Sequence, residues 1–181
     1  MYYAQNSNAL MDTLSLPPAT PLAGDEAARF DVANRLFLRL YQASNLMHRT
    51  GTKAVSSFGA TTQQWAVLGA LSRPRARQSG MTVKELMAFL MVSRQNLTAV
   101  LDRLEAGGLV ERTRTAGADG RLRHVRLTAE GERRWAAMHG DIRRYYSTAL
   151  EGFSTEECLA LFRLLDRLRD SLGRIAGAEQ E

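Results

Sequence analysis

The sequence predicts a mainly α-helical protein with one small β-hairpin, or wing, between two helical regions. Two patterns support this fold class. Apolar residues recur at steps of three and four along most of the chain, which is the period of an amphipathic helix. Between residues 109 and 127, two short segments alternate apolar and polar residues instead, which is the period of a strand.

The composition is that of a globular protein. Of the 181 residues, 45% are hydrophobic and 24% are charged, so the chain can bury a core and leaves little room for extensive disorder. A formal net charge of +5 favours polyanionic partners. No apolar run approaches the roughly 18 residues that span a membrane, and the N-terminus lacks a signal-peptide pattern. We therefore expect a cytoplasmic protein with no membrane partner.

The first part of the chain combines a proline-rich arm with a long helix. Three prolines fall within the first 27 residues and interrupt any nascent helix there. Apolar residues at helical spacing begin at Phe30, and this helix should end before Gly59. Thr61 or Thr62 can cap the next helix, with Gln64 completing a capping box, and the segment from Ser72 to Gly80 then breaks it.

Two short helices separated by a tight turn follow Gly80. Thr82 can cap the first and Ser93 the second. In the second helix the apolar residues Leu97, Val100, Leu101 and Leu104 face inward, which leaves a polar and basic outer face. Such a face suits a DNA major groove, although a merely solvated helix face has the same pattern. The expected DNA contacts are Ser93, Arg94, Gln95, Asn96, Thr98 and Arg103.

The predicted wing is rich in arginine. Its strands cover residues 109–114 and 124–127, and its loop covers residues 116–121. Arginines on a wing beside an outward helix can reach the adjacent minor groove, whose negative potential attracts guanidinium groups. A basic surface hairpin without a DNA role is the alternative. The wing residues expected at DNA are Arg112, Arg114, Arg121 and Arg123, with Asp119 orienting Arg121 through a salt bridge.

Two further helices complete the chain. Thr128 can cap the first, whose apolar stripe comprises Trp135, Met138, Ile142, Tyr145 and Ala149. Ser154 and Glu157 can cap the last, which carries a heptad seam that includes Cys158. The seam can pack internally or against a second copy of the chain, and we favour the second. The expected dimer contacts are Phe30, Phe37, Leu161, Leu165, Leu168, Leu172 and Ile175.

Nothing in the sequence predicts an enzyme. The three histidines lack the spacing of metal ligands, and no phosphate-binding loop or nucleophile motif occurs, so we expect no cofactor and no metal. The single cysteine, Cys158, excludes a disulfide within the chain and is expected to be an inert buried thiol. The expected regions are a flexible arm (1–27), an N-terminal dimerisation helix (28–60), a winged helix-turn-helix lobe (61–128) and C-terminal dimerisation helices (129–181).

Over residues 62–131 the sequence resembles the MarR family of bacterial regulators. The resemblance lies in the order and spacing of TQQWAVL from Thr62, LDRLEAGGLVER from Leu101, DGR from Asp119 and VRLTAEG from Val125. The family commonly has a second basic residue where Gly120 stands. The resemblance implies a DNA-binding dimer on a pseudo-palindromic operator, whose DNA affinity responds to a small ligand, often an aromatic acid or phenol.

The resemblance also implies a ligand pocket where the dimerisation helices meet the DNA-binding lobe. The candidate ligand residues there are Tyr41, His48, Arg49, Trp65 and Trp135, although both tryptophans can equally be core residues. We expect a repressor that an aromatic acid, phenol or related thioester releases from its operator. The alternatives are a winged-helix protein-interaction module and a DNA-binding protein that needs no ligand.

Overall fold

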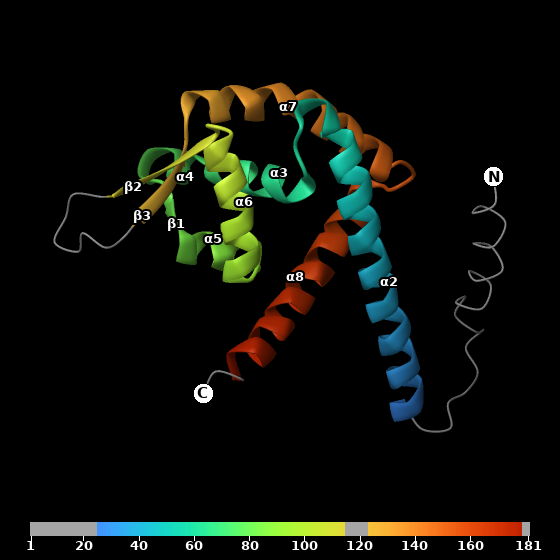
Figure 1. Cartoon of the computed structure of the whole chain (residues 1–181). Helices are drawn as coiled ribbons and strands as arrows, with labels where there is room; N and C mark the ends of the chain where they lie inside the picture. The colour runs from blue at the N-terminus through green and yellow to red at the C-terminus, as the bar shows by residue number, and fades with distance from the viewer. Residues whose placement is uncertain (1–24, 115–122, 179–181) are drawn as a thin grey trace. The chain divides into compact units, whose positions relative to one another are not determined.

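The computed structural model describes residues 25–114 and 123–178 (Figure 1). It confirms the predicted fold class, because helices dominate and the strands form one small antiparallel sheet. The chain divides into two units, Met1–Lys53 and Ala54–Glu181, and each is described by itself. None of the described helices is long and apolar enough to cross a membrane.

In the first unit the described residues form one long helix, α2 (Asp25–Ala54). Its predicted apolar side chains are largely exposed, with exposed fractions of 69% at Phe30 and 47% at Phe37. A single 3-10 turn, η1 (Ser56–Phe58), follows in the second unit, and Gly59 closes it at a φ of 64°. The helix therefore ends before Gly59, as its sequence predicted.

The next two helices begin with different local signals. α3 (Thr62–Leu71) has the predicted capping box, in which Thr61 Oγ1 accepts from the Gln64 N–H and Gln64 Oε1 accepts from the Thr61 N–H. α3 ends at Leu71, so the predicted break is confirmed. The breaking segment nevertheless contains a short helix that was not predicted, α4 (Pro74–Ser79). Proline fits the first helical position because the N–H there has no partner within a helix.

The predicted pair of short helices is α5 (Val83–Leu90) and α6 (Arg94–Ala106). Thr82 and Glu85 form a capping box on α5, and Ser93 Oγ accepts from the Asn96 N–H at the start of α6. The inward side of α6 is buried as predicted. Its buried residues are Leu97, Val100, Leu101 and Leu104.

The sheet has the strand order β1-β3-β2, with both pairings antiparallel. β2 (Val110–Arg114) and β3 (Arg123–Leu127) form the predicted hairpin, in which Val110 pairs with Leu127. β1 (Met81–Thr82) was not predicted, and it adds to the other edge of β3. The wing loop with Asp119 and Arg121 lies outside the described residues.

The C-terminal helices are α7 (Ala129–Ala149) and α8 (Thr155–Ala178). The predicted caps Thr128 and Ser154 are both present. Of the predicted apolar stripe on α7, Met138 and Ile142 are buried and Trp135 and Tyr145 are half-buried, whereas Ala149 is exposed. Cys158 is half-buried rather than buried, since no residue of α8 is buried in the single chain.

A close contact joins α7 to the end of α6. The Thr128 N–H donates to the Leu109 carbonyl at 3.1 Å, and the Thr128 hydroxyl donates to the Gly108 carbonyl at 2.6 Å. Thr128 Oγ1 also accepts from the Gly131 N–H at 3.0 Å. A Cβ at position 131 would lie 1.9 Å from the Leu109 carbonyl oxygen, so the contact requires glycine there. We call these four residues, Gly108, Leu109, Thr128 and Gly131, the Thr128 junction.

We predict that Gly131→Ala lowers the free energy of unfolding by about 2 kcal/mol or more, because the methyl group forces the Thr128 junction apart. Gly140→Ala is the matched control on the same helix, since a Cβ there meets nothing within 4 Å. We expect the control to raise stability by roughly 0.5 to 1 kcal/mol through helix propensity. Urea denaturation of both variants measures the difference, and equal stabilities would contradict the steric role of Gly131.

Candidate nucleic-acid interface

The outer face of α6 carries exposed polar and basic side chains that have no partners among the described residues. Arg94, Gln95, Asn96, Thr98 and Arg103 are all exposed, and the cap residue Ser93 is exposed as well. Among the described residues, none of the first five side chains forms a hydrogen bond or an ion pair with another. The opposite face of the same helix is buried in the core, which fixes the direction of the outer face. These donors and acceptors are therefore free to meet an external ligand.

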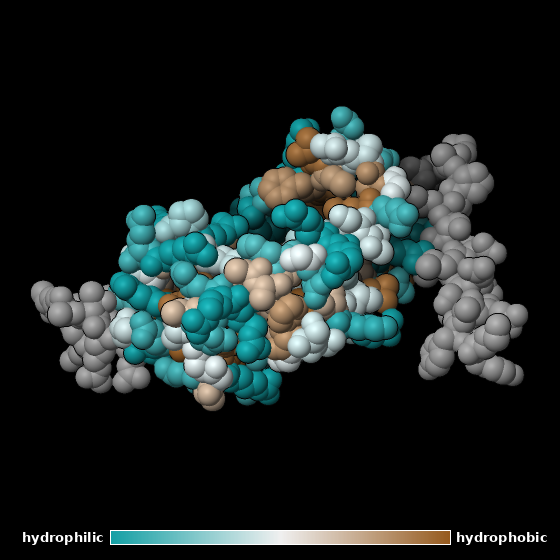
Figure 2. Space-filling view, turned by 90° about the horizontal axis from the view of Figure 1, so that it is seen from above, coloured by the Kyte–Doolittle hydropathy of each residue, from teal (hydrophilic) through white to brown (hydrophobic). Residues whose placement is uncertain are grey.

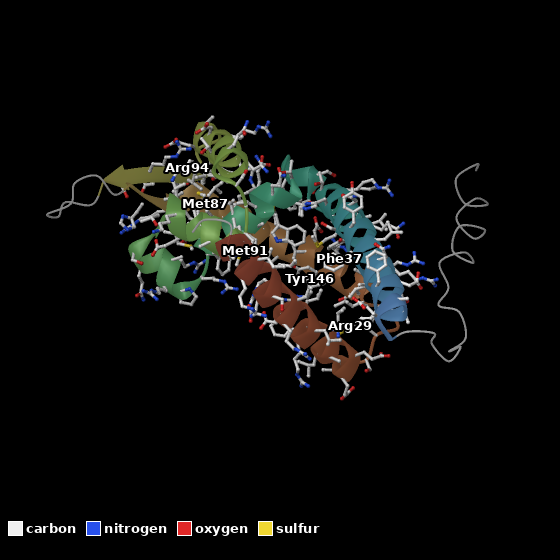
Figure 3. The ribbon with its side chains drawn as sticks, turned by 90° about the horizontal axis from the view of Figure 1, so that it is seen from below. Arg29, Phe37, Met87, Met91, Arg94 and Tyr146 are labelled. Carbon is white, nitrogen blue, oxygen red and sulfur yellow. The ribbon has the colours of Figure 1, made fainter. Side chains whose placement is uncertain are left out.

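The turn between α5 and α6 positions the start of this face. Met91 adopts a left-handed conformation with a φ of 53°, and the Val92 N–H donates to the Met87 carbonyl at 3.3 Å. Figure 3 labels Met87, Met91 and Arg94, which belong to the end of α5, the turn and the first turn of α6. The tight turn brings the Ser93 cap directly after α5. The N-terminus of α6, with its positive dipole end, is thus exposed beside Arg94.

Arg112 of the wing is bound to α6 rather than free. Its guanidinium lies 2.6 Å from the Asp102 carboxylate and 3.5 Å from that of Glu105. The Arg112 side chain is 21% exposed, and its Nε is buried without a partner in the described part of the chain. The structure therefore places this predicted DNA contact in an ion-pair cluster between β2 and α6. Sequence reasoning missed the two acidic partners, because they lie on α6, ten and seven positions before Arg112 on β2.

Some of the remaining predicted wing contacts lie outside the described residues. Arg114 and Arg123 pair at the end of the hairpin, and their backbone positions are described. Asp119, Arg121 and the salt bridge expected between them lie outside the described residues. The register of β2 against β3 nevertheless directs the hairpin end away from the Thr128 junction, because the Val110–Leu127 pair lies at that junction and the Arg114–Arg123 pair at the far end.

The predicted ligand residues fall in two units. Trp65 is 8% exposed, and its ring centroid lies 5.9 Å from that of Tyr145 and 5.6 Å from that of Tyr146. Trp135 is half-buried, and the Cβ of a residue at position 69 would lie 3.0 Å from its ring. Both tryptophans thus pack on α3 and α7 within the second unit. The other three candidates, Tyr41, His48 and Arg49, are exposed on α2 in the first unit.

A shallow pocket in the second unit does not include any of the five predicted ligand residues. It has a volume of about 410 Å³ and is lined by Ala54, Asp141, Arg144, Tyr145 and Thr148. Arg144 donates to Asp141 within the pocket, so its guanidinium is already oriented. Tyr145 joins the pocket to the predicted set, because its ring contacts that of Trp65 edge to face. Burial raises the pKa of the neighbouring Tyr146 phenol.

The predicted dimer seam is uncovered in the single chain. Figure 2 shows apolar residues as brown patches at the surface. On α8 the exposed fractions are 43% at Leu161, 42% at Leu165, 41% at Leu172 and 61% at Ile175, while Leu168 is half-buried. An amphipathic helix of 24 residues without a buried residue requires a further surface to cover it.

The capped helix pair, the outward basic face and the β-wing together define a winged helix-turn-helix protein of the DNA-binding class. A model of the MarR family matches residues 58–122. The transcriptional activatory protein BadR of Rhodopseudomonas palustris is 44% identical over 158 residues, covering 87% of this chain and 88% of BadR. The chain therefore belongs to the MarR family of DNA-binding transcriptional regulators, as its motifs indicated.

Two solved structures share the fold. The structure of the MepR–DNA complex of S. aureus aligns with a TM-score of 0.64 at 23% identity, covering 77% of this chain and 95% of that chain. The organohalide-sensing regulator RdhR-CbdbA1625 in its 2,4-dichlorophenol-bound form aligns with a TM-score of 0.68 at 17% identity, covering 86% and 89%. At these identities, the likeness shows the fold alone.

We predict that Asp102→Asn weakens DNA binding about two- to fivefold, because Arg112 then holds the wing less firmly against α6. If Arg112 instead contacts DNA directly, the same change frees its guanidinium and tightens binding. Glu111→Gln is the control for the lost negative charge, since Glu111 is an exposed acid on β2 outside this ion-pair cluster. Fluorescence anisotropy with labelled duplex DNA at constant salt distinguishes the two signs.

Proposed function

We propose that the protein binds a specific double-stranded operator as a homodimer and regulates transcription there. The observation that carries this proposal is the set of five exposed side chains on α6, which have no partner within residues 25–114 and 123–178 and lie opposite a buried face of the same helix. In this proposal Gln95 and Asn96 read adenine edges and Arg94 reads guanine, while Ser93, Thr98 and Arg103 hold the helix on the DNA backbone. Arg114, Arg121 and Arg123 extend the contact into the minor groove.

We propose that α8 and α2 form the dimer interface with the same helices of a second copy. The exposed apolar seam of α8 supports this, because exposing such a surface to water costs free energy. Isologous pairing would bury the seam on both copies of the chain. A two-fold dimer presents two α6 helices to successive major grooves, about 34 Å apart on a pseudo-palindrome. Because its partner is DNA, we place its action in the cytoplasm.

The proposed direction of regulation is activation. The sequence led us to expect a repressor that a ligand releases. The relative at 44% identity is named an activatory protein, however, and that name is the support for activation. We propose that a ligand changes operator affinity by its differential affinity for the free and DNA-bound conformations, commonly by about 1 to 3 kcal/mol.

We propose that the ligand is a small aromatic acid, or a phenol or thioester of similar shape. The pocket beside Tyr145 supports this class, because it offers an aromatic face and the oriented guanidinium of Arg144. A neighbour that shares only the fold is described with 2,4-dichlorophenol bound, so this fold can hold a small phenol. We assign the carboxylate anchor to Arg144 in place of the predicted Arg49, because Arg144 lines a described pocket.

We predict that mutations of base-reading residues and of residues that contact the DNA backbone have different effects on DNA binding. Gln95→Ala and Asn96→Ala should each relax preference at particular base pairs by about 1 to 3 kcal/mol, whereas Arg121→Ala should weaken binding to all sequences and lower the salt slope by about one. Arg143→Ala, an exposed arginine on α7, is the matched control and should change neither. Anisotropy titrations on operator and random duplexes test this. Equal losses on both DNAs for all three variants, or a monomer by light scattering, would contradict the proposal.

We predict that Arg144→Ala reduces the effect of an active aromatic acid on operator affinity at least about tenfold, because the carboxylate loses its charged partner. Arg143→Ala is again the control, and Arg49→Ala tests the anchor that the sequence indicated. Thermal shift and operator titration with a panel of benzoates and their thioesters give the readout. An undiminished effect in Arg144→Ala would show that the pocket is not the ligand site, and loss in Arg49→Ala alone would restore the earlier assignment.

A further inference from the structure

An arginine and a phenylalanine stack on the surface of the DNA-binding lobe. The Arg73 guanidinium carbon lies 4.5 Å from the ring centroid of Phe89. Arg73 caps α4, the helix that the sequence did not predict, and Phe89 lies near the end of α5 with 44% of its surface exposed. An exposed cation–π pair stabilises a protein less than full burial of the phenyl ring would. The stability of the single chain therefore does not explain why the Phe89 ring is exposed.

Met91 adds a second apolar side chain two residues after Phe89. It is 69% exposed, and it is the one non-glycine residue with positive φ in the described ranges 25–114 and 123–178. Glycine would adopt this left-handed turn with less strain. A strained position that also exposes a large apolar side chain indicates a role other than folding. The outer side of α5 therefore ends in two uncovered apolar groups.

The exposed charged residues at the α4 cap, on α4 and on α5 are predominantly positive. Arg73, Arg75 and Lys84 are exposed, and none of them forms an ion pair with another described residue. Glu85 lies on the same exposed side of α5, but its carboxylate is engaged in the capping box with the Thr82 N–H at 2.7 Å and the Thr82 hydroxyl at 2.9 Å. These hydrogen bonds, from the backbone first and then the side chain, lower the pKa of Glu85. Glu85 therefore stays ionised, and the charge of Arg75 acts on its carboxylate. Three cations against this one carboxylate leave the region net positive, which complements an acidic partner.

We infer that this region is a docking surface for an acidic, partly apolar surface of RNA polymerase at the promoter. We call it the Arg73 surface, and it comprises Arg73, Arg75, Lys84, Phe89 and Met91. The inference rests on the proposed function, and specifically on activation. Arginine, phenylalanine and methionine are enriched at the centres of protein–protein interfaces. DNA phosphates need cations and hydrogen-bond donors but gain nothing from an exposed phenyl ring and thioether, so the composition favours a protein partner over DNA.

The Arg73 surface and the proposed DNA face are formed by different side chains. The DNA face uses the outward residues of α6 and the wing, whereas the Arg73 surface uses α4, the outer side of α5 and the turn. Arg73 contributes to folding through its backbone as the α4 cap, and its side chain makes no capping hydrogen bond. Its side chain can therefore be changed while α4 and the DNA face remain in place.

The test compares operator binding with activated transcription for Arg73→Glu and Phe89→Ala. Purified full-length dimer, operator-promoter DNA and the RNA polymerase holoenzyme of the same organism are used at saturating occupancy. We expect operator Kd to stay within about twofold of wild type for each variant, while the activated transcript falls at least about fivefold. Arg133→Glu is the matched charge reversal, because Arg133 is an exposed arginine of α7 that pairs with Glu130 of its own helix. It should retain both activities.

Each other result contradicts the inference in a distinct way. If transcript and operator affinity fall together, the Arg73 surface contacts DNA rather than a protein. If both stay unchanged, the surface has no role in activation. Arg73→Gln, which removes the charge without reversing it, repeats the test if Arg73→Glu lowers the melting temperature. A wild-type protein that binds its operator without raising transcription overturns activation and this inference together, and one that binds no DNA overturns the proposed function itself.

Discussion

The arrangement of the second unit depends on the Thr128 junction. One threonine donates to the carbonyls of Gly108 and Leu109 and accepts from the N–H of Gly131, so a single residue joins the end of α6, the start of β2, the end of β3 and the start of α7. The contact is possible because Gly131 has no Cβ. Without the Thr128 junction, the distance between the wing and α6 would be less firmly fixed. DNA recognition requires a fixed distance, because both elements must fit their grooves at once.

The local signals in the sequence were sufficient to predict most of the helices. Side-chain caps depend on residues three apart, and apolar periodicity depends on one helix at a time, so Thr61, Thr82, Ser93, Thr128 and Ser154 were all identified correctly. α4 was missed because Pro74 was interpreted as a helix breaker, although Pro also begins helices. β1 was missed because two residues carry no period, and its pairing with β3 spans more than forty positions.

The site was predictable to a lesser extent, for the same physical reason. The outward face of α6 follows from its own apolar stripe, so the structure exposes each of the α6 residues that the sequence indicated. The place of Arg112 depends on Asp102 and Glu105, which reach it only through the tertiary packing of β2 on α6. The ligand residues were assigned by resemblance, and the described pocket lies one side chain away from Trp65, beyond Tyr145. The pocket forms where Ala54 meets α7, and no local pattern encodes that packing.

In the proposed ligand response, α7 is the element that connects the pocket to the DNA-binding face. It begins at the Thr128 junction and carries Arg144 and Tyr145 about 20 Å further along its axis, at a rise of about 1.5 Å per residue. Between these two points, α7 packs against α3 through Trp135 over Gly69 and through Tyr145 against Trp65. A ligand that shifts the packing of Tyr145 therefore acts on the helix whose first turn holds the wing and α6 together. Coupling between ligand binding and DNA binding needs an element that can adopt two discrete arrangements. α7 can serve as that element, because it is one continuous helix from the Thr128 junction to the pocket.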